Sequence, residues 1–232
     1  MVVIVPSRGR PTAALELAGT FQATCALNTR PVFAVDADDP TAEDYQEVVR
    51  QGLGSVIVAD HTSMVDALNR RAAGYANLEE DLRPTAIGFM GDDHRPRSVG
   101  WDAAYLAVLA ERPGFVYGND LVQRANLPTQ IAISTSVVAA LGHMAPGCLT
   151  HLYVDNYWRH LGQAAGCITY LPDVVVEHLH PVAGTAPVDD GYLRVNAPEM
   201  YARDRAAFQA YMAEHGQREV LAVRESCVAV AR

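Results

Sequence analysis

Residues 86–93 read Ala86-Ile87-Gly88-Phe89-Met90-Gly91-Asp92-Asp93. An apolar run of this length predicts a buried strand, and its two closing carboxylates predict a polar end. Paired carboxylates can bind a hard divalent cation, which bridges phosphate oxygens. They can also cap a helix, and His94-Arg95-Pro96-Arg97-Ser98 leads toward a predicted one. The motif alone therefore leaves metal binding and helix capping open.

Apolar runs and helical spacing alternate along the chain on both sides of this stretch. Strands are predicted over residues 2–5, 31–35, 55–59, 86–90, 115–118, 131–134, 168–171 and 174–176. Helices are predicted over residues 12–28, 41–52, 64–78, 99–111, 136–143, 155–165 and 198–214. This alternation predicts an α/β fold, with a mostly parallel central sheet flanked by helices in a single domain. Residues 183–194 are polar and rich in Gly and Pro, which is typical of a mobile loop.

Three predicted strands end in polar or acidic turns. These turns are Pro6-Ser7-Arg8, Asp36-Ala37-Asp38-Asp39 and Gly91-Asp92-Asp93. Ligands of open α/β sheets bind outside the carboxyl ends of the strands, so we expect the three turns to converge at one edge. A single acidic turn residue is commonly a turn former, and only the clustering favours a binding site.

A second candidate motif, Glu177-His178-Leu179-His180-Pro181, follows the strand predicted over 174–176. In an extended segment, side chains two residues apart point to the same side, so His178 and His180 can face one ligand. Neutral imidazole is a good metal ligand. An isolated histidine is more often structural, and a spaced pair is the stronger signal for a metal.

A third motif, Tyr153-Val154-Asp155-Asn156, opens the helix predicted over 155–165. Asp155 is either the cap of that helix or a general base that accepts a proton from a substrate hydroxyl. The residues by themselves favour the cap.

Composition narrows the classes of partner. The chain has 232 residues and a net charge of −9, with 27 acidic and 18 basic residues. This charge opposes broad binding to nucleic acid or anionic membrane. The sequence shows no membrane span and no basic leader before Pro6, and its four cysteines form no Cys-x-x-Cys pair. A cytoplasmic protein with reduced thiols is the default expectation.

In order and spacing, these segments resemble the family-two glycosyltransferases, nucleotide-sugar transferases of the GT-A fold. The resemblance covers about residues 2–181 and rests on five segments together. These are the opening Val2 to Pro11, Val35 to Asp39, Ala67-Leu68-Asn69-Arg70, Phe89 to Asp93, and Asp155 with its continuation to His178. In two places the sequence departs from the family pattern: Gly91 stands at the usual first Asp of an Asp-x-Asp motif, and Asp155-Asn156 replaces Glu-Asp.

The resemblance implies a metal-dependent, inverting transfer of a sugar from a nucleoside-diphosphate sugar to an acceptor hydroxyl. It assigns the catalytic base to Asp155 and Mn²⁺ or Mg²⁺ binding to Asp93, His178 and His180. It assigns donor contacts to a set of six residues: Pro6, Arg8, Asp36, Asp38, Asn69 and Asp92. It also implies a donor-binding half over residues 1–120, an acceptor half over 121–215 and a tail over 216–232. A loop over 183–192 is expected to close over the donor.

Three other functions stay open. One is a nucleotidyltransferase that activates sugars, although the turn Ser7-Arg8-Gly9-Arg10 has a single glycine. Another is a non-catalytic nucleotide-binding protein of the same fold, and a third is a zinc hydrolase built on His178 and His180. The acceptor is open between a glycan, a protein side chain and a modified nucleobase, and the oligomeric state is open as well.

Overall fold

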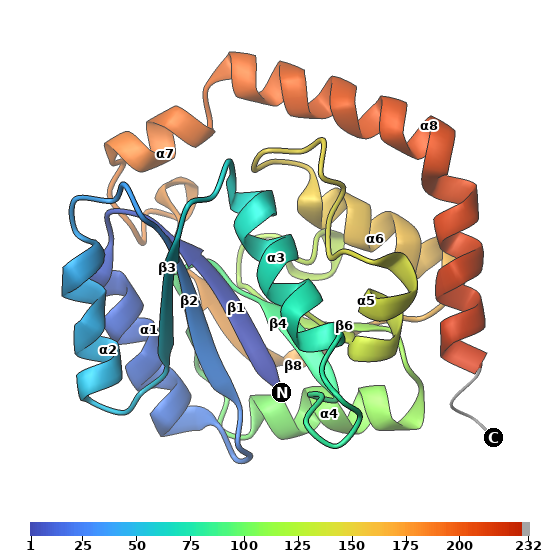
Figure 1. Ribbon diagram of the computed structural model, residues 1–232, viewed down its shortest axis with the longest axis horizontal. Coiled ribbons are helices and arrows are strands. Elements are labelled where there is room, and N and C mark those ends of the chain that lie inside the picture. The colour runs from blue at the N-terminus through green and yellow to red at the C-terminus, as the bar shows by residue number, and fades with distance from the viewer. Residues whose placement is uncertain (229–232) are drawn as a thin grey trace.

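The computed structural model describes residues 1–228, apart from the side chains of Val182, Asp190 and Val228. A central eight-stranded sheet carries helices on both faces (Figure 1). Its strand order is β3-β2-β1-β4-β7-β6-β8-β5. The strands are β1 Val2–Ser7, β2 Arg30–Asp36, β3 Ser55–Ala59, β4 Ala86–Phe89, β5 His94–Pro96, β6 Phe115–Asn119, β7 Ile131–Ser134 and β8 Ile168–His178.

The sheet is mostly parallel, as the sequence predicts. β1 pairs in parallel with β2 and β4, β2 with β3, and β6 with β8. β7 runs antiparallel to both β4 and β6, and β5 runs antiparallel to β8. Six strands therefore share one direction, and their carboxyl ends reach the same edge of the sheet.

The helices cover the two faces in separate groups. They are α1 Pro11–Thr24, α2 Gln46–Arg50, α3 Met64–Ala76, α4 Trp101–Glu111, α5 Thr135–Leu141, α6 Val154–Ala165, α7 Asp190–Val195 and α8 Pro198–Val228. Short 3₁₀ turns lie at Ala42–Tyr45, Arg124–Asn126 and Pro181–Ala183. One core cluster joins the sheet to α1, α2 and α4, and the other joins it to α3, α5, α6 and α8.

Alternation along β1 supplies both core clusters. Val3 and Val5 pack on the α1 side, whereas Val2 and Ile4 pack on the α3 side. Successive residues of a strand point to opposite faces, so an unbroken apolar run is what a strand covered on both faces requires. Each fully buried side chain of this kind contributes about 1.5–3 kcal/mol.

The structure differs from the expected elements around His94. The sequence predicts no strand between Asp93 and the helix expected over 99–111, but residues 94–96 form β5, a three-residue strand at the edge of the sheet. Helix α4 begins only after Gly100, which has a φ of 78°. Pro96 is compatible with this strand because an edge strand tolerates a missing N–H donor.

The C-terminal third also departs from expectation. The two short strands expected over 168–176 form one strand, β8, with an irregularity opposite Gly118 and Asn119. The loop expected over 183–194 contains the helix α7. The helix expected to end near Glu214 continues to Val228, so residues 216–228 are helical rather than a tail. Figure 1 shows α8 crossing the top of the view and descending its right side, where it packs on α5 and α6.

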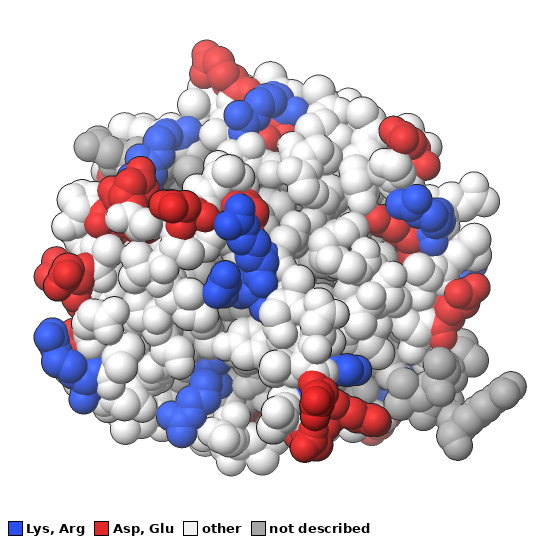
Figure 2. Space-filling view, in the orientation of Figure 1, with Lys and Arg blue, Asp and Glu red and all other residues white. Residues whose placement is uncertain are grey.

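No helix within residues 1–228 is long and apolar enough to cross a bilayer. Figure 2 shows basic side chains, all of them arginine in this chain, standing singly or in small groups among acidic ones. On this face they form no broad basic surface, in keeping with the negative net charge.

Candidate functional site

The three polar turns meet at the carboxyl edge of the sheet, as the sequence predicts. The Ser7 hydroxyl, at the end of β1, donates to Asp92 after β4 at 2.5 Å. Arg8 lies beside Asp36 at the end of β2, with 3.0 Å between Nη1 and Oδ2. Because β1 lies between β2 and β4, its end is the centre on which the other two turns converge.

Asp92 is the buried member of the acidic pair. Its carboxylate accepts from Ser7 and lies 3.2 Å from Nη1 of Arg10, and the residue is 6% exposed. Burial, together with the charge of Asp93, raises the pKa of Asp92 to about 6. Asp92 is thus directed toward β1 and α1, and Asp93 is left as the carboxylate that faces the histidines.

Asp93, His94 and His178 form the candidate metal centre. One ligand atom from each lies within 4.8 Å of the others. Asp93 Oδ1 is 3.2 Å from His94 Nδ1, and Asp93 Oδ2 is 3.5 Å from His178 Nε2. The two imidazoles stack with centroids 4.3 Å apart, since His94 of β5 pairs directly with His178 of β8. A carboxylate and two imidazoles form a donor set that divalent transition metals accept.

The ionisable groups of this centre are an acidic carboxylate, Asp93, and an imidazole, His178, whose proton a metal ion can replace. Burial opposes the charge on Asp93, but the hydrogen bond from His178 and the nearby imidazole of His94 outweigh it and lower the pKa of Asp93 well below its usual range. Burial also opposes the charged form of His178, yet Asp93, Asp120 and Asp155 raise the pKa of its imidazole. A metal ion takes such a site by displacing the imidazole proton.

His94 is neutral and held from both sides. Burial and the neighbouring His178 lower its pKa. Its Nδ1 accepts from the Gly91 N–H at 3.1 Å, and its Nε2 lies 3.5 Å from the Thr129 hydroxyl. Thr129 in turn donates to Asp120 at 2.8 Å. The Thr129 contact orients the ring, whereas Nδ1 would have to exchange its hydrogen bond from Gly91 for a bond to a metal ion.

His180 lies next to this centre. Its ring is 4.9 Å from that of His178 and 5.4 Å from that of Tyr192 in α7. Within residues 1–228, the group of three whose ligand atoms lie within 4.8 Å of one another contains His94 and not His180. Metal binding by Asp93, His178 and His180 stays a prediction.

The predicted donor residues divide into two groups. Arg8 binds Asp36 and makes two contacts to Asp38, one of them 3.1 Å from Nη2 to Oδ2. His61, which the sequence did not single out, places Nδ1 3.0 Å from Asp36 Oδ1. Its Nε2 is buried and lacks a hydrogen-bond partner among the described residues. Pro6 lies inside β1, half-buried beside these charges.

Asn69 lies apart from this group and serves the fold. Its amide donates to the Ala145 carbonyl at 2.8 Å and accepts from the N–H groups of Met144 and Ala145 at 3.0 and 3.1 Å. These bonds fasten α3 to the segment before α6. A donor contact by Asn69 stays a prediction, and its side chain already has these partners.

Asp155 is not the cap of α6. The capping position belongs to Tyr153, whose φ is 66°, and Asp155 lies in the first turn. Its carboxylate accepts from the N–H of Asn156 at 2.8 Å. Burial raises its pKa to about 6, and its charge contributes to the raised pKa of His178. The Asp155 carboxylate is therefore close enough to His178 of the candidate metal centre to interact with it electrostatically.

Arg10 is a residue of this edge to which the sequence analysis assigned no role. It lies just before α1, between the acidic pair and α7. Its Nη2 lies 2.8 and 2.7 Å from the two carboxylate oxygens of Asp189. Asp189 follows Arg10 by 179 positions, and no local pattern predicts such a contact.

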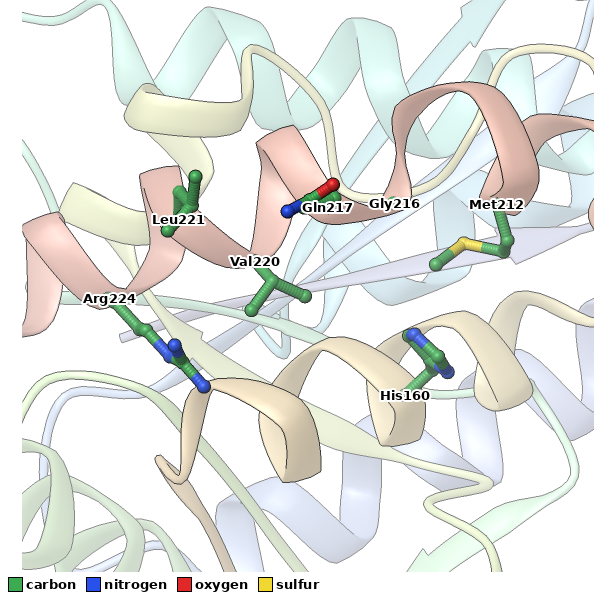
Figure 3. A pocket seen from close by; sticks show the side chains of 7 residues that line it. All are labelled: His160, Met212, Gly216, Gln217, Val220, Leu221 and Arg224. Atoms are coloured by element: carbon green, nitrogen blue, oxygen red, sulfur yellow. The ribbon is translucent and has the colours of Figure 1, made fainter.

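A groove between α6 and α8 is a separate feature (Figure 3). It has a volume of about 360 Å³ and is lined by side chains such as His160, Met212 and Val220. None of its lining residues belongs to the acidic centre.

Among solved structures, those similar in fold to this chain include glycosyltransferases. A mannosyltransferase from Pyrobaculum calidifontis, in complex with GDP-Man and Mn²⁺, aligns at a TM-score of 0.61 and 14% identity, over 99% of this chain and 74% of that one. TarS of S. aureus, residues 1–349 with UDP-GlcNAc, aligns at 0.56 and 12% identity, over 92% and 72%. A longer TarS chain is covered over 43% of its length.

A third structure is glucosyl-3-phosphoglycerate synthase of Mycobacterium tuberculosis, in complex with Mn²⁺, UDP and glucosyl-3-phosphoglycerate. It aligns at a TM-score of 0.60 and 11% identity, over 90% of this chain and 78% of that one. No family model and no curated protein sequence matches the chain. The chain therefore has the GT-A glycosyltransferase fold that its sequence predicts.

Proposed function

We propose that this protein transfers a sugar from a nucleoside-diphosphate sugar to an acceptor hydroxyl, with metal assistance and inversion at the anomeric carbon. The observation that carries the proposal is the Asp93, His94 and His178 cluster at the carboxyl edge of a GT-A sheet. Relatives in fold that contain Mn²⁺ together with GDP-Man or UDP support the same assignment.

Asp93 and His178, joined by His94 or His180, would hold the divalent cation. Two imidazole donors favour Mn²⁺ over Mg²⁺, which takes mainly oxygen ligands. Such a cation neutralises the charge that develops on a departing nucleoside diphosphate.

The other residues act on the two substrates. Arg8, Asp36 and Asp38 bind the nucleoside, and His61 orients Asp36 through its 3.0 Å contact. Asp155 accepts the proton of the acceptor hydroxyl as that oxygen attacks the anomeric carbon. This division assigns the donor to residues 1–120 and the acceptor to residues 121–215 of one domain. We also propose that the protein is cytoplasmic.

A second candidate follows from the donor set. One carboxylate and two imidazoles also suit zinc, whose hydrolytic sites keep an open position for water. Metal analysis of the purified protein separates the two functions. Tightly bound zinc, with no nucleotide binding, would favour the hydrolase.

Turnover of nucleotide sugars tests the proposal. Release of nucleoside diphosphate from GDP-mannose, UDP-glucose and UDP-N-acetylglucosamine is measured with Mn²⁺ and with a chelator. Asp93→Ala removes the central carboxylate and should reduce the rate at least ~100-fold, the scale of a lost electrostatic contact to a leaving group. Full activity of Asp93→Ala in chelator would contradict the metal assignment.

Asp155→Asn tests the base. A carboxylate with a pKa of about 6 is mostly ionised above that pH, so the wild-type rate should rise with pH through about 6 and then level off. Asp155→Asn should reduce the rate ~10²–10⁴-fold and abolish this rise, with donor binding retained. Unchanged transfer in this variant would remove Asp155 as the base.

A further inference from the structure

Arg10 is a fixed cation placed against the candidate metal centre. Nη1 lies 3.2 Å from Asp92 Oδ1 and 3.9 Å from Asp93 Oδ2. Asp93 Oδ2 is also the oxygen that faces His178 Nε2 at 3.5 Å. The metal-binding side of Asp93 therefore already faces a guanidinium and an imidazole.

These two neighbours differ in how they can accommodate a cation. The neutral imidazole of His178 is itself a metal ligand. A guanidinium keeps its proton in a protein, so Arg10 can yield only by finding other negative partners. Asp189 supplies one such partner on the opposite side, through both of its oxygens.

The chemistry of the guanidinium indicates what else it can bind. Its N–H donors form a planar fork that matches phosphate oxygens and pairs with two of them at once. The Arg10 side chain is 30% exposed, and it lies beside Asp92 and Asp93. A diphosphate that enters at this edge of the sheet can therefore reach it.

We propose that Arg10 is a positioning residue with a different partner in each state of the site. In the empty site it pairs with the carboxylates of Asp92 and Asp189, and in the filled site it pairs with the diphosphate of the donor. The choice of a diphosphate rests on the proposed function. While the site is empty, the guanidinium opposes any cation at Asp93. Once a diphosphate arrives, Arg10 binds it and the opposition ends, so metal and donor bind cooperatively.

Arg10 also connects this exchange to α7. Asp189 caps α7 by accepting from the Tyr192 N–H at 2.7 Å while it binds Arg10. A guanidinium that turns toward a diphosphate loosens its pair with Asp189. Occupation of the donor site is thereby transmitted to residues 189–195.

Mn²⁺ binding without and with nucleotide tests the proposal. Free Mn²⁺ is followed by electron paramagnetic resonance, alone and with GDP or UDP, in the wild type, Arg10→Gln, Arg10→Met and Arg10→Lys. The neutral variants should bind Mn²⁺ alone ~5-fold more tightly than the wild type, yet bind nucleotide with Mn²⁺ at least ~10-fold more weakly, a coupling of ordinary size. Arg10→Lys retains the charge and should bind Mn²⁺ alone as the wild type does.

Arg50→Gln is the matched control, because Arg50 is exposed and pairs with Glu47 on α2. It should match the wild type in both measurements. Two neutral variants are used so that misfolding of one leaves the comparison intact.

The outcomes separate the two proposals. If nucleotide binds the wild type, but Mn²⁺ alone binds the neutral variants no more tightly, the role of Arg10 is overturned and the proposed function stands. If the wild type with Mn²⁺ binds neither GDP nor UDP, and none of the nucleotide sugars tested above, the proposed function fails. The diphosphate role of Arg10 then fails with it.

Discussion

Gly91 decides how the acidic turn is arranged at the scale of a single residue. A Cβ at this position would lie 2.5 Å from Asp93 Oδ1 and 3.2 Å from His94 Nδ1. The first Asp of an Asp-x-Asp motif therefore has no room here while Asp93 and His94 keep their places. This turn combines a carboxylate with an imidazole instead, and Gly91 donates its N–H to that imidazole.

Substituting Gly91 by alanine should damage the metal centre. The added methyl pushes the Asp93 carboxylate away from His94, and we expect Mn²⁺ affinity to fall ~10-fold, equivalent to about 1.4 kcal/mol. Binding is measured by calorimetry with nucleotide present. Gly19→Ala is the control, since Gly19 lies in α1 with nothing within 4 Å of a new Cβ. Equal Mn²⁺ affinity in the wild type and Gly91→Ala would contradict this account of the turn.

At the scale of elements, α8 holds the segment that leads to Asp155. Asp204 of α8 is fully buried, and its Oδ2 accepts from the N–H groups of Thr150, His151 and Leu152 at 3.2, 2.9 and 2.9 Å. Burial opposes the charge, but these backbone hydrogen bonds outweigh it and lower the pKa of Asp204. The C-terminal helix thus orders the turn from which α6 begins.

Removing this carboxylate should destabilise the whole domain. Asp204→Ala leaves three part-buried N–H groups without their acceptor, and we expect a loss of about 2–4 kcal/mol in the free energy of unfolding, measured by urea denaturation. Asp204→Asn retains an acceptor oxygen and should lose about 1 kcal/mol.

The pH dependence of this loss has a definite sign. The lowered pKa means that Asp204 stabilises the fold at neutral pH, and that this contribution disappears as pH falls through the folded-state value, below 3.8. The gap between the wild type and Asp204→Asn should therefore close in acid. A gap that is constant down to pH 3 would show that the charge of Asp204 does not stabilise the turn.

Helices and strands that depend on a local sequence pattern could be predicted from the sequence. Contacts between segments that lie far apart in the sequence could not. The strands at 55–59 and 131–134 were predicted to the residue, because an apolar run bounded by polar residues is a local signal. β5 has three residues and exists because β8 pairs with it, so His94 showed its role only through its register with His178. The acidic turns were found because parallel strands bring their carboxyl ends together. Arg10 was missed because its partner Asp189 lies far along the chain.

On the scale of the whole molecule, the site joins segments from nearly the entire chain. Ser7, Asp36 and His178 end the strands β1, β2 and β8, and Asp93 lies between β4 and β5. Asp155 comes from the first turn of α6. The strands β1, β2, β4 and β8 contribute side chains to both core clusters. Unfolding of either cluster therefore separates some of these site residues from one another. A ligand that contacts several of these residues must therefore stabilise the complete fold.

Thermal unfolding should report the donor directly. A ligand at 100 times its dissociation constant adds about 2.7 kcal/mol to the free energy of unfolding. For a chain of this size, we expect Tm to rise by about 5–10 °C with the correct nucleotide sugar and Mn²⁺. The same sugar with a chelator, or with Asp93→Ala, should give a much smaller rise, because the diphosphate then lacks its cation. An equal rise in chelator would mean that the nucleotide binds without the acidic centre, and a flat response to every donor would count against nucleotide-sugar binding altogether.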